Sequence, residues 1–404
     1  LNTYMGTTYI YGTIVPELRE DKENIMRTFK GLTRNTLGVG AALAMGMAAT
    51  VAVAEDLPKT MVWSSYDLGS AGHTEATGMA NALQNSYPVR IRIVPSGTSI
   101  GRMLPMVTGR VTYGFLGNEA FFSSEATFDF AAKQWGPQDV RVLMGRPSPL
   151  GMATSRCDDH NVRTIADLKG LKIGYVKGNP SVNVKNDALL AFAGLTRDDV
   201  EAVWFGGWGQ QLPAILAGQI DVMSNVPTSG QVRQIEASPG GLCWPEMPAS
   251  DAEGWKRTQA VAGFLKPVKA TAGAGLSEES PRELAGYRYP ILTTYAKTSD
   301  DEVYALMKAL HATFDGYNST TVASKGWAMG IGGLPPYDAP THSGAVRLLK
   351  EIGVWKAENQ TWNDARLDRI AKVQIAWDNA VAAFDDWRVE QKAAGTKINA
   401  EEAW

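Results

Sequence analysis

Short apolar runs alternate with amphipathic segments along most of the chain after residue 54, and glycine, proline or small polar residues separate them. Short apolar runs between turn signals are typical of strands, whereas longer periodic segments are typical of helices. The pattern predicts strands at 60–64, 89–94, 111–116, 140–144, 171–176 and 220–223. It predicts helices at 74–84, from Ser99 onward, and at 182–193, 210–217, 300–314 and 364–388. This alternation predicts an α/β fold, with the segment 249–280 left unassigned.

The last predicted helix carries an apolar stripe at helical spacing. A stripe of this kind is more often a face packed on a core than a partner site, and we predict a core face. Its members are Leu367, Ile370, Val373, Trp377, Val381 and Phe384.

Three turns rich in glycine, serine and threonine each join a predicted strand to a predicted helix, at 69–73, 96–99 and 178–181. Helix N-termini present free backbone N–H groups and the positive end of the helix dipole. Converging on one cleft, such turns would hold an anionic group without a metal. Together with hydroxyl groups they would support micromolar binding, about 8 kcal/mol. The alternative is ordinary helix capping, and the sequence does not show whether the turns converge.

Residues 26–54 read as a secretory signal peptide. Basic residues (Arg27, Lys30 and Arg34) come first, an uncharged apolar stretch follows, and Ala52-Val53-Ala54 forms a small-residue cleavage site. We therefore predict a periplasmic protein whose mature chain begins near Glu55, with residues 1–25 as an upstream extension. The alternative is a membrane anchor, since the uncharged stretch 35–54 is about long enough to span a bilayer.

Charge and cysteine content narrow the picture further. The chain of 404 residues has a formal net charge of −3, so nothing predicts a nucleic-acid partner. Its length after the leader implies two lobes or two domains. The two cysteines, Cys157 and Cys243, form either a disulfide or two buried thiols, and the sequence leaves both open. The four histidines show no ligand spacing, so we expect neither a metal nor a cofactor.

Several short segments, in order, match a known pattern. They are Gly69-Ser70-Ala71-Gly72-His73, Ser96-Gly97-Thr98-Ser99, the run from Asp167 to Ile173, the loop from Gly174 to Ser181, the run from Leu216 to Asp221, His342-Ser343-Gly344-Ala345 and Lys350-Glu351-Ile352-Gly353. With these segments the chain resembles the TAXI-type solute-binding proteins of tripartite ATP-independent periplasmic (TRAP) transporters. The resemblance covers about residues 61–384.

The resemblance implies an α/β, two-lobed periplasmic binding protein of type II-like architecture. Each lobe would be a mixed sheet flanked by helices, with the ligand cleft between them. We expect residues 55–152 and 290–404 to form one lobe and residues 153–289 the other. The family carries small organic anions, often dicarboxylates such as glutamate or 2-oxoglutarate, to a membrane permease. His73-Thr74 and Asn179-Pro180 depart from the family pattern and leave the ligand's identity open.

Candidate ligand-binding residues lie on the turns, on the first helical residues and after strand ends. They are Ser70, His73, Thr98, Ser99, Arg102, Asn118, Glu119, Asn179, Ser181, Asn183, Trp208, Asn225 and Thr228. Arg102 is suited to pair with a carboxylate, or else is a surface arginine. Glu119 is suited to receive a ligand ammonium, or else is solvated or caps a helix. Trp208 either walls an apolar part of the ligand or packs in the core.

Motifs of catalysis are missing from the sequence. It contains no Gly-x-Ser-x-Gly elbow, no phosphate-binding Walker loop and no His-Glu-x-x-His zinc motif. We therefore predict a binding protein and not an enzyme. Two alternatives stay open: a ligand-sensing protein that reports to a membrane receptor, and a periplasmic hydrolase.

Overall fold

The structure, a computed structural model, describes residues 57–404. Its strands form one sheet in the order β2-β1-β3-β9-β4-β7-β5-β6, with β8 paired to β9. The strands are β1 (Thr60–Tyr66), β2 (Arg90–Ser96), β3 (Tyr113–Leu116), β4 (Val140–Thr154), β5 (Lys172–Val176), β6 (Glu201–Phe205), β7 (Val222–Asn225), β8 (Lys266–Ala270) and β9 (Arg282–Tyr295).

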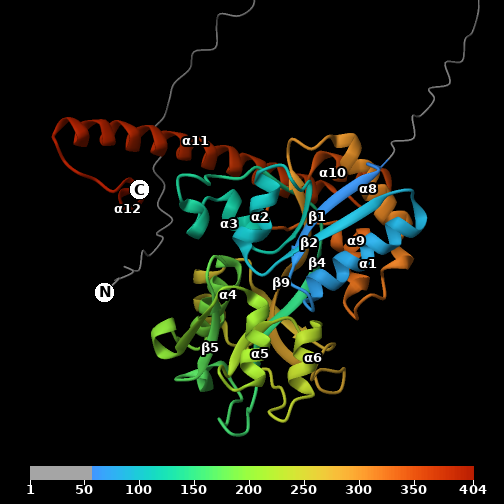
Figure 1. The fold of residues 1–404 in the computed structure, drawn as a ribbon. Coiled ribbons are helices and arrows are strands. Elements are labelled where there is room, and N and C mark those ends of the chain that lie inside the picture. The colour runs from blue at the N-terminus through green and yellow to red at the C-terminus, as the bar shows by residue number, and fades with distance from the viewer. Residues whose placement is uncertain (1–56) are drawn as a thin grey trace, which may run out of the picture. The chain divides into compact units, whose positions relative to one another are not determined.

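Helices flank the sheet in two groups. Figure 1 shows α4, α5 and α6 beside β5, while α1, α8, α9 and α10 lie around β1 and β2. The helices are α1 (Ala71–Ser86), α2 (Ser99–Val107), α3 (Glu119–Ser124), α4 (Pro180–Phe192), α5 (Gln211–Leu216), α6 (Gly230–Glu236), α7 (Ala252–Val261), α8 (Asp300–Ala312), α9 (Met329–Gly332), α10 (Ser343–Glu351), α11 (Ala357–Ala393) and α12 (Ala400–Ala403).

Two long antiparallel strands, β4 and β9, connect the two groups. The beginning of β4 pairs with the end of β9, which also pairs with β3. The end of β4, at Gly151–Thr154, pairs with β7. We call the part around β1, β2 and β3 the first lobe and the part around β5, β6 and β7 the second lobe. The mixed α/β, two-lobed fold predicted from the sequence is confirmed.

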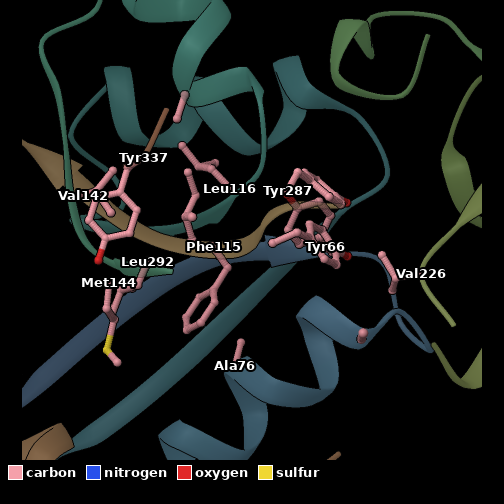
Figure 2. Packing of buried hydrophobic residues seen from close by; sticks show 14 of the residues in the cluster. Tyr66, Ala76, Phe115, Leu116, Val142, Met144, Val226, Tyr287, Leu292 and Tyr337 are labelled. Atoms are coloured by element: carbon pink, nitrogen blue, oxygen red, sulfur yellow. The ribbon is translucent and has the colours of Figure 1, made fainter. Parts of the chain in front are cut away.

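The core of the first lobe lies between its strands and α1. Phe115 and Leu116 of β3 pack with Leu292 of β9 and Met144 of β4, and Ala76 of α1 faces them (Figure 2). All five are fully buried, because strands covered on both faces expose neither set of side chains to water. Each large apolar side chain buried in this way stabilises the fold by about 1.5–3 kcal/mol.

Helix α4 shows how local sequence places functional groups. Asn179 caps the helix, accepting a hydrogen bond from the N–H of Val182, and Pro180 occupies the first turn, where its missing N–H costs nothing. The helix ends at Phe192, and Gly194 two residues later adopts φ +74°, a conformation that glycine allows just past a helix end. This start places Ser181 and Lys185 four residues apart on one helix face.

Cys157 and Cys243 form a disulfide. The bridge joins the segment after β4 to the segment before α7, across a sequence separation of 86. Closing a loop of this length stabilises a fold by roughly 4–5 kcal/mol in the loop-entropy account. The alternative of two free thiols is therefore not realised.

The apolar stripe of α11 differs from the prediction. Among its members Ile370 is buried and the others are half-exposed, because the helix extends past the sheet (Figure 1). Trp377 and Phe384 instead pack against the C-terminal Trp404, with ring centroids 5.2 and 5.0 Å away. The stripe is thus mostly a local aromatic contact and not a core face.

Other differences concern the middle of the chain. The unassigned segment 249–280 contains α7 and β8, the strand predicted at 140–144 continues to Thr154, and β6 and β9 were not predicted.

The predicted signal peptide lies outside the described residues. Within residues 57–404, no helix has the length and apolar character needed to cross a membrane.

Candidate ligand-binding cavity between the lobes

A small cavity of about 40 Å³ lies where the two lobes meet. Strand ends and helix starts from both lobes contribute to it, as expected for a cleft at the ends of a sheet's strands. Its lining residues are Tyr66, Asp67, Ser96, Gly97, Arg102, Leu150, Asn179, Ser181, Val182, Lys185, Trp208, Ser224, Asn225, Val226, Tyr287 and Tyr289.

Hydrogen bonds between the lobes close the cavity on one side. The Asn179 side chain donates from Nδ2 to the carbonyl of Gly97 (3.0 Å) and accepts at Oδ1 from Ser99 Oγ (2.8 Å). The N–H of Trp208 donates to the same Gly97 carbonyl at 3.1 Å. We call these four residues the rim. A Cβ at Gly97 would lie 2.9 Å from the Trp208 nitrogen, so the lobes approach this closely only over a glycine.

Further bonds extend the contact. The N–H of Gly209 donates to Asp67 Oδ2 at 2.9 Å, and Ser229 Oγ donates to the carbonyl of Gly69 at 3.3 Å. The three turns predicted from the sequence thus meet the opposite lobe. The contacts of these turns with the opposite lobe are mainly the hydrogen bonds at Gly69, Gly97 and Asn179.

Arg102 supplies one buried cation to the cavity. It is 1% exposed and donates from Nε to Glu119 Oε1 (2.7 Å) and from Nη1 to the carbonyl of Ser96 (2.9 Å). Its guanidinium carbon also lies 4.0 Å from the centroid of the Tyr66 ring. Burial alone would raise the pKa of Glu119, but the charge and hydrogen bond of Arg102 outweigh it and lower that pKa. The pair is therefore ionised.

Lys185 supplies a second buried cation. It is 5% exposed, and its Nζ donates to Ser181 Oγ at 3.3 Å and lies 4.5 Å from the centroid of the Tyr287 ring. Ser181 is its one hydrogen-bond acceptor among the described residues, although an ammonium has three protons to donate. Desolvation lowers the pKa of Lys185 to about 8, with Glu119 opposing the shift. An anion beside Nζ would offset this desolvation.

Three tyrosines form the apolar wall. Tyr287 stacks on Tyr289 with ring centroids 5.5 Å apart, and Tyr289 makes a T-shaped contact with Tyr66 at a centroid distance of 4.9 Å. Figure 2 shows Tyr66 and Tyr287 together near Val226. Burial raises the pKa of all three phenols well above 10, so their hydroxyls stay protonated and available for hydrogen bonding.

The balance of charge and donors favours an anion. Arg102 and Lys185 line the cavity, whereas Asp67 is the one lining carboxylate and already accepts from Gly209. Asn225 is 4% exposed, and its Nδ2 has no hydrogen-bond partner in residues 57–404. A buried donor without an acceptor costs about 1–3 kcal/mol, which a ligand oxygen would recover.

Five of the residues predicted from the sequence line the cavity: Arg102, Asn179, Ser181, Trp208 and Asn225. The other eight do not. Ser99 donates a hydrogen bond to Asn179 at the rim, and Glu119 pairs with Arg102 on the side away from the cavity. Asn118 donates to Asp338 Oδ1 at 3.2 Å, in the same buried layer, where desolvation raises the pKa of Asp338 to about 6.

The remaining predicted residues serve local structure. Ser70 and Thr98 cap α1 and α2, and Asn183 bonds through both side-chain atoms to the backbone of Val176. His73 Nδ1 and Thr228 Oγ1 are buried without a partner in the part of the chain that the structure describes. Desolvation lowers the pKa of His73, so its ring is neutral near pH 7.

Sequence reasoning missed Lys185 and the tyrosines. Lys185 falls one helical turn after Ser181, and that spacing was the available signal. Tyr287 and Tyr289 lie on β9, a strand that the apolar pattern did not reveal. Tyr66 and Asp67 lie two and three residues after the end of the predicted strand 60–64, where that strand reaches the cavity.

Two lobes joined by a pair of long strands, with a cavity lined by charged residues between them, define a protein with the fold of periplasmic solute-binding proteins. The chain belongs to the NMT1-like family, whose model matches residues 132–353, more than half of the chain.

Solved structures show distant similarity. A protein from Bordetella bronchiseptica RB50 shares 19% identity over 75% of this chain and 91% of its own, with a TM-score of 0.43. An amino acid ABC transporter substrate-binding protein from Streptococcus pneumoniae, bound to L-arginine, shares 12% identity over 65% and 92%, with a TM-score of 0.39. The alkanesulfonate-binding protein from Xanthomonas axonopodis pv. citri, bound to MOPS, shares 14% identity over 73% and 91%, with a TM-score of 0.37. With TM-scores below 0.5, the fold assignment rests on the chain's own strand order.

Proposed function

We propose that this chain is a periplasmic solute-binding protein that captures a small organic anion, a carboxylate or dicarboxylate, and delivers it to a TRAP-type membrane permease. The observation that carries the proposal is the pair of buried cations, Arg102 and Lys185, lining one cavity between the lobes. Burying two cations without a ligand is costly, and a carboxylate would pair with both.

Closure around the ligand follows from the architecture. We propose that residues 55–152 and 290–404 move as one body and residues 153–289 as the other, with the bending in β4 and β9. The rim bonds then form when the lobes close, so ligand binding and closure are coupled. The closed lobes would present a surface that the permease distinguishes from the open form.

Export supports the same role. Residues 26–54 have the layout of a signal peptide, and the disulfide between Cys157 and Cys243 suits an oxidising compartment such as the periplasm. The TRAP-type permease is proposed from the resemblance of the motifs between Gly69 and Gly353.

The experiment is a ligand screen on the purified mature chain. A ligand at 100 times its dissociation constant stabilises a folded protein by about 2.7 kcal/mol, which raises the melting temperature by several degrees. We expect at least one mono- or dicarboxylate to give this shift, with isothermal titration confirming a single site. Native mass spectrometry of freshly purified protein should show the same anion retained. No response to any organic acid would overturn the proposal.

One observation favours a second candidate function. Ser181 Oγ and Lys185 Nζ lie 3.3 Å apart, and a lysine with a pKa of about 8 is a suitable base for a serine nucleophile. A periplasmic hydrolase would release p-nitrophenol from p-nitrophenyl acetate, and Ser181→Ala would abolish the release. Turnover that Ser181→Ala leaves intact, or no turnover at all, excludes this candidate.

A further inference from the structure

Asp67 places a carboxylate on the cavity wall that has no ion pair among residues 57–404. Its Oδ2 accepts from the N–H of Gly209 at 2.9 Å, and its Oδ1 has no hydrogen-bond partner in that part of the chain. Gly209 follows Trp208, so this negative charge lies next to the rim. A ligand that enters the cavity therefore meets a carboxylate as well as the two cations.

The two cations of the cavity are balanced to different degrees. Arg102 donates from Nε to Glu119 Oε1 at 2.7 Å, so a carboxylate of the protein already compensates its charge. Lys185 donates to the hydroxyl of Ser181 and to no carboxylate of the described chain. The cavity thus offers one cation without a bonded counter-ion, and a single carboxylate on the ligand would supply it.

A second negative charge on the ligand would find no such partner. The cavity has a volume of about 40 Å³, so the far end of a small ligand stays close to the walls. There it would meet the charge of Asp67, and the carboxylates of Glu119 and Asp338 add to the negative charge near Lys185. Like charges held close together in a partly desolvated site repel each other.

From this distribution of charge we infer that the cavity selects ligands with a single carboxylate over dicarboxylates of the same length, and that Asp67 sets this preference. An amide or hydroxyl at the far end of the ligand carries no charge and can donate a hydrogen bond to Asp67 Oδ1. The inference rests on the proposed function and narrows its ligand class to monocarboxylates.

Dicarboxylates and their monoamides test the inference, because the two members of each pair differ in charge but hardly in size. Isothermal titration of the mature chain at pH 7 compares malonate with malonamate, succinate with succinamate and glutarate with glutaramate. Within any pair that binds, we expect the monoamide to bind more tightly, by roughly tenfold or more. Any other acid found in the ligand screen is compared in the same way with its counterpart of one charge more or less.

The outcomes separate the inference from the proposed function. A dicarboxylate that binds as tightly as its monoamide, or more tightly, overturns the selectivity and leaves the proposed function standing. Binding of no organic acid at all overturns the proposed function itself.

Removing the charge of Asp67 gives a second test. Asp67→Asn keeps the shape and an oxygen that can accept from Gly209, so we expect the dicarboxylate to gain affinity while the monoamide keeps its own. The preference should shrink roughly tenfold. A merely structural role of Asp67 would instead weaken both ligands equally.

Asp368→Asn is the matched control, at an exposed position of α11 that does not line the cavity, and it should keep the wild-type preference. An unaltered preference in a folded Asp67→Asn protein contradicts the assignment of Asp67. Should that variant not fold, the ligand pairs on the wild-type protein still decide whether the cavity prefers a single charge.

Discussion

Residues 57–404 contain two fully buried arginine–glutamate pairs, and these differ in how many of their hydrogen-bonding groups have partners. Arg146 contacts Glu75 through two bonds, Nε to Oε2 at 2.6 Å and Nη2 to Oε1 at 2.7 Å. Trp327 Nε1 donates to Oε2 at 2.8 Å and Thr321 Oγ1 to Oε1 at 2.7 Å. Both oxygens of Glu75 therefore have two partners each.

The second pair, Arg102 and Glu119, is incomplete. One bond of 2.7 Å joins the two side chains, and Tyr66 OH lies 3.5 Å from the same Glu119 oxygen. The other oxygen, Oε2, has no hydrogen-bond partner in the described chain. Lys185 lines the same cavity, likewise with unused donors.

This difference distinguishes a buried ion pair that stabilises the fold from one that is suited to a ligand site. A buried pair whose bonding groups are all used holds elements together and has nothing left for a ligand. Arg102 lines a cavity beside a second buried cation, Lys185, and an anion in that cavity would offset the cost of desolvating the two cations. The Arg146 pair therefore belongs to the scaffold of the first lobe, and the Arg102 pair to the site.

Breaking the complete pair should have the largest effect. Glu75→Ala leaves the buried guanidinium of Arg146 uncompensated, so we expect the free energy of unfolding to fall by about 3–5 kcal/mol. Urea denaturation followed by circular dichroism measures this. Glu253→Ala, at an exposed pair with Lys256, is the control and should change stability by less than about 1 kcal/mol. If Glu75→Ala lowers the free energy of unfolding by no more than the control does, the pair does not stabilise the fold.

Removing the second cation of the site should separate binding from stability. Lys185→Met keeps the unbranched stem but removes the charge, so ligand affinity should fall by about 1.5–3 kcal/mol, roughly 10- to 150-fold. The ligand-free protein should meanwhile become more stable by about 3 kcal/mol at pH 7, because a buried ammonium with a depressed pKa no longer has to be desolvated.

Titration calorimetry and thermal unfolding read out the two effects of Lys185→Met. The exposed Lys256→Met on α7 is the matched control and should leave both unchanged. Full ligand affinity in Lys185→Met would remove this lysine from the site. Lower stability without ligand would show that its charge supports the fold.

The pH dependence of stability and of ligand affinity is a further test of the buried charge on Lys185. Folding depresses the pKa of Lys185 from 10.5 to about 8, so between these values the unfolded chain holds more protons and this group makes stability rise with pH. Below pH 8 its desolvation penalty is fully present. An anion binds the protonated form, so affinity should fall above pH 8 by up to tenfold per pH unit. Calorimetry from pH 6 to 10 measures this, and a flat profile that Lys185→Met shares would contradict it.

The sequence predicted the scaffold better than the site for a physical reason. Apolar periodicity reports burial along one element, and it revealed β1, α4 and α8 at nearly their observed bounds. It missed β9, whose tyrosines, arginines and proline interrupt the apolar run. Two of the three cavity tyrosines lie there, so part of the site was hidden with the strand.

The roles of the candidate residues on the turns could not be predicted from the sequence for a different reason. A small polar residue at a helix start can cap the helix, bond across the cleft or contact a ligand, and its local sequence is the same in all three cases. Ser70 caps its own helix, Ser99 bonds across the cleft, and Ser181 lines the cavity. Only the packing of one lobe on the other distinguishes them.

The rim should give the smallest effect, and it tests whether closure contributes apart from charge. Asn179→Ala removes both side-chain bonds across the cleft, to Gly97 and from Ser99, but leaves Arg102 and Lys185 in place. We expect ligand affinity to fall by about 1 kcal/mol, roughly fivefold, mainly through faster release as the lobes open more readily. Loss of the cap on α4 adds a comparable cost in stability.

Stopped-flow release and small-angle scattering of the Asn179 variant would report the two parts. Thr98→Ala removes the cap of α2 without removing a bond between the lobes, so it controls for capping and should leave the release rate near that of the wild type. An equal acceleration in both variants would mean that the rim acts only through helix stability. If only Asn179→Ala releases the ligand faster, lobe closure contributes to ligand affinity in addition to the two cations.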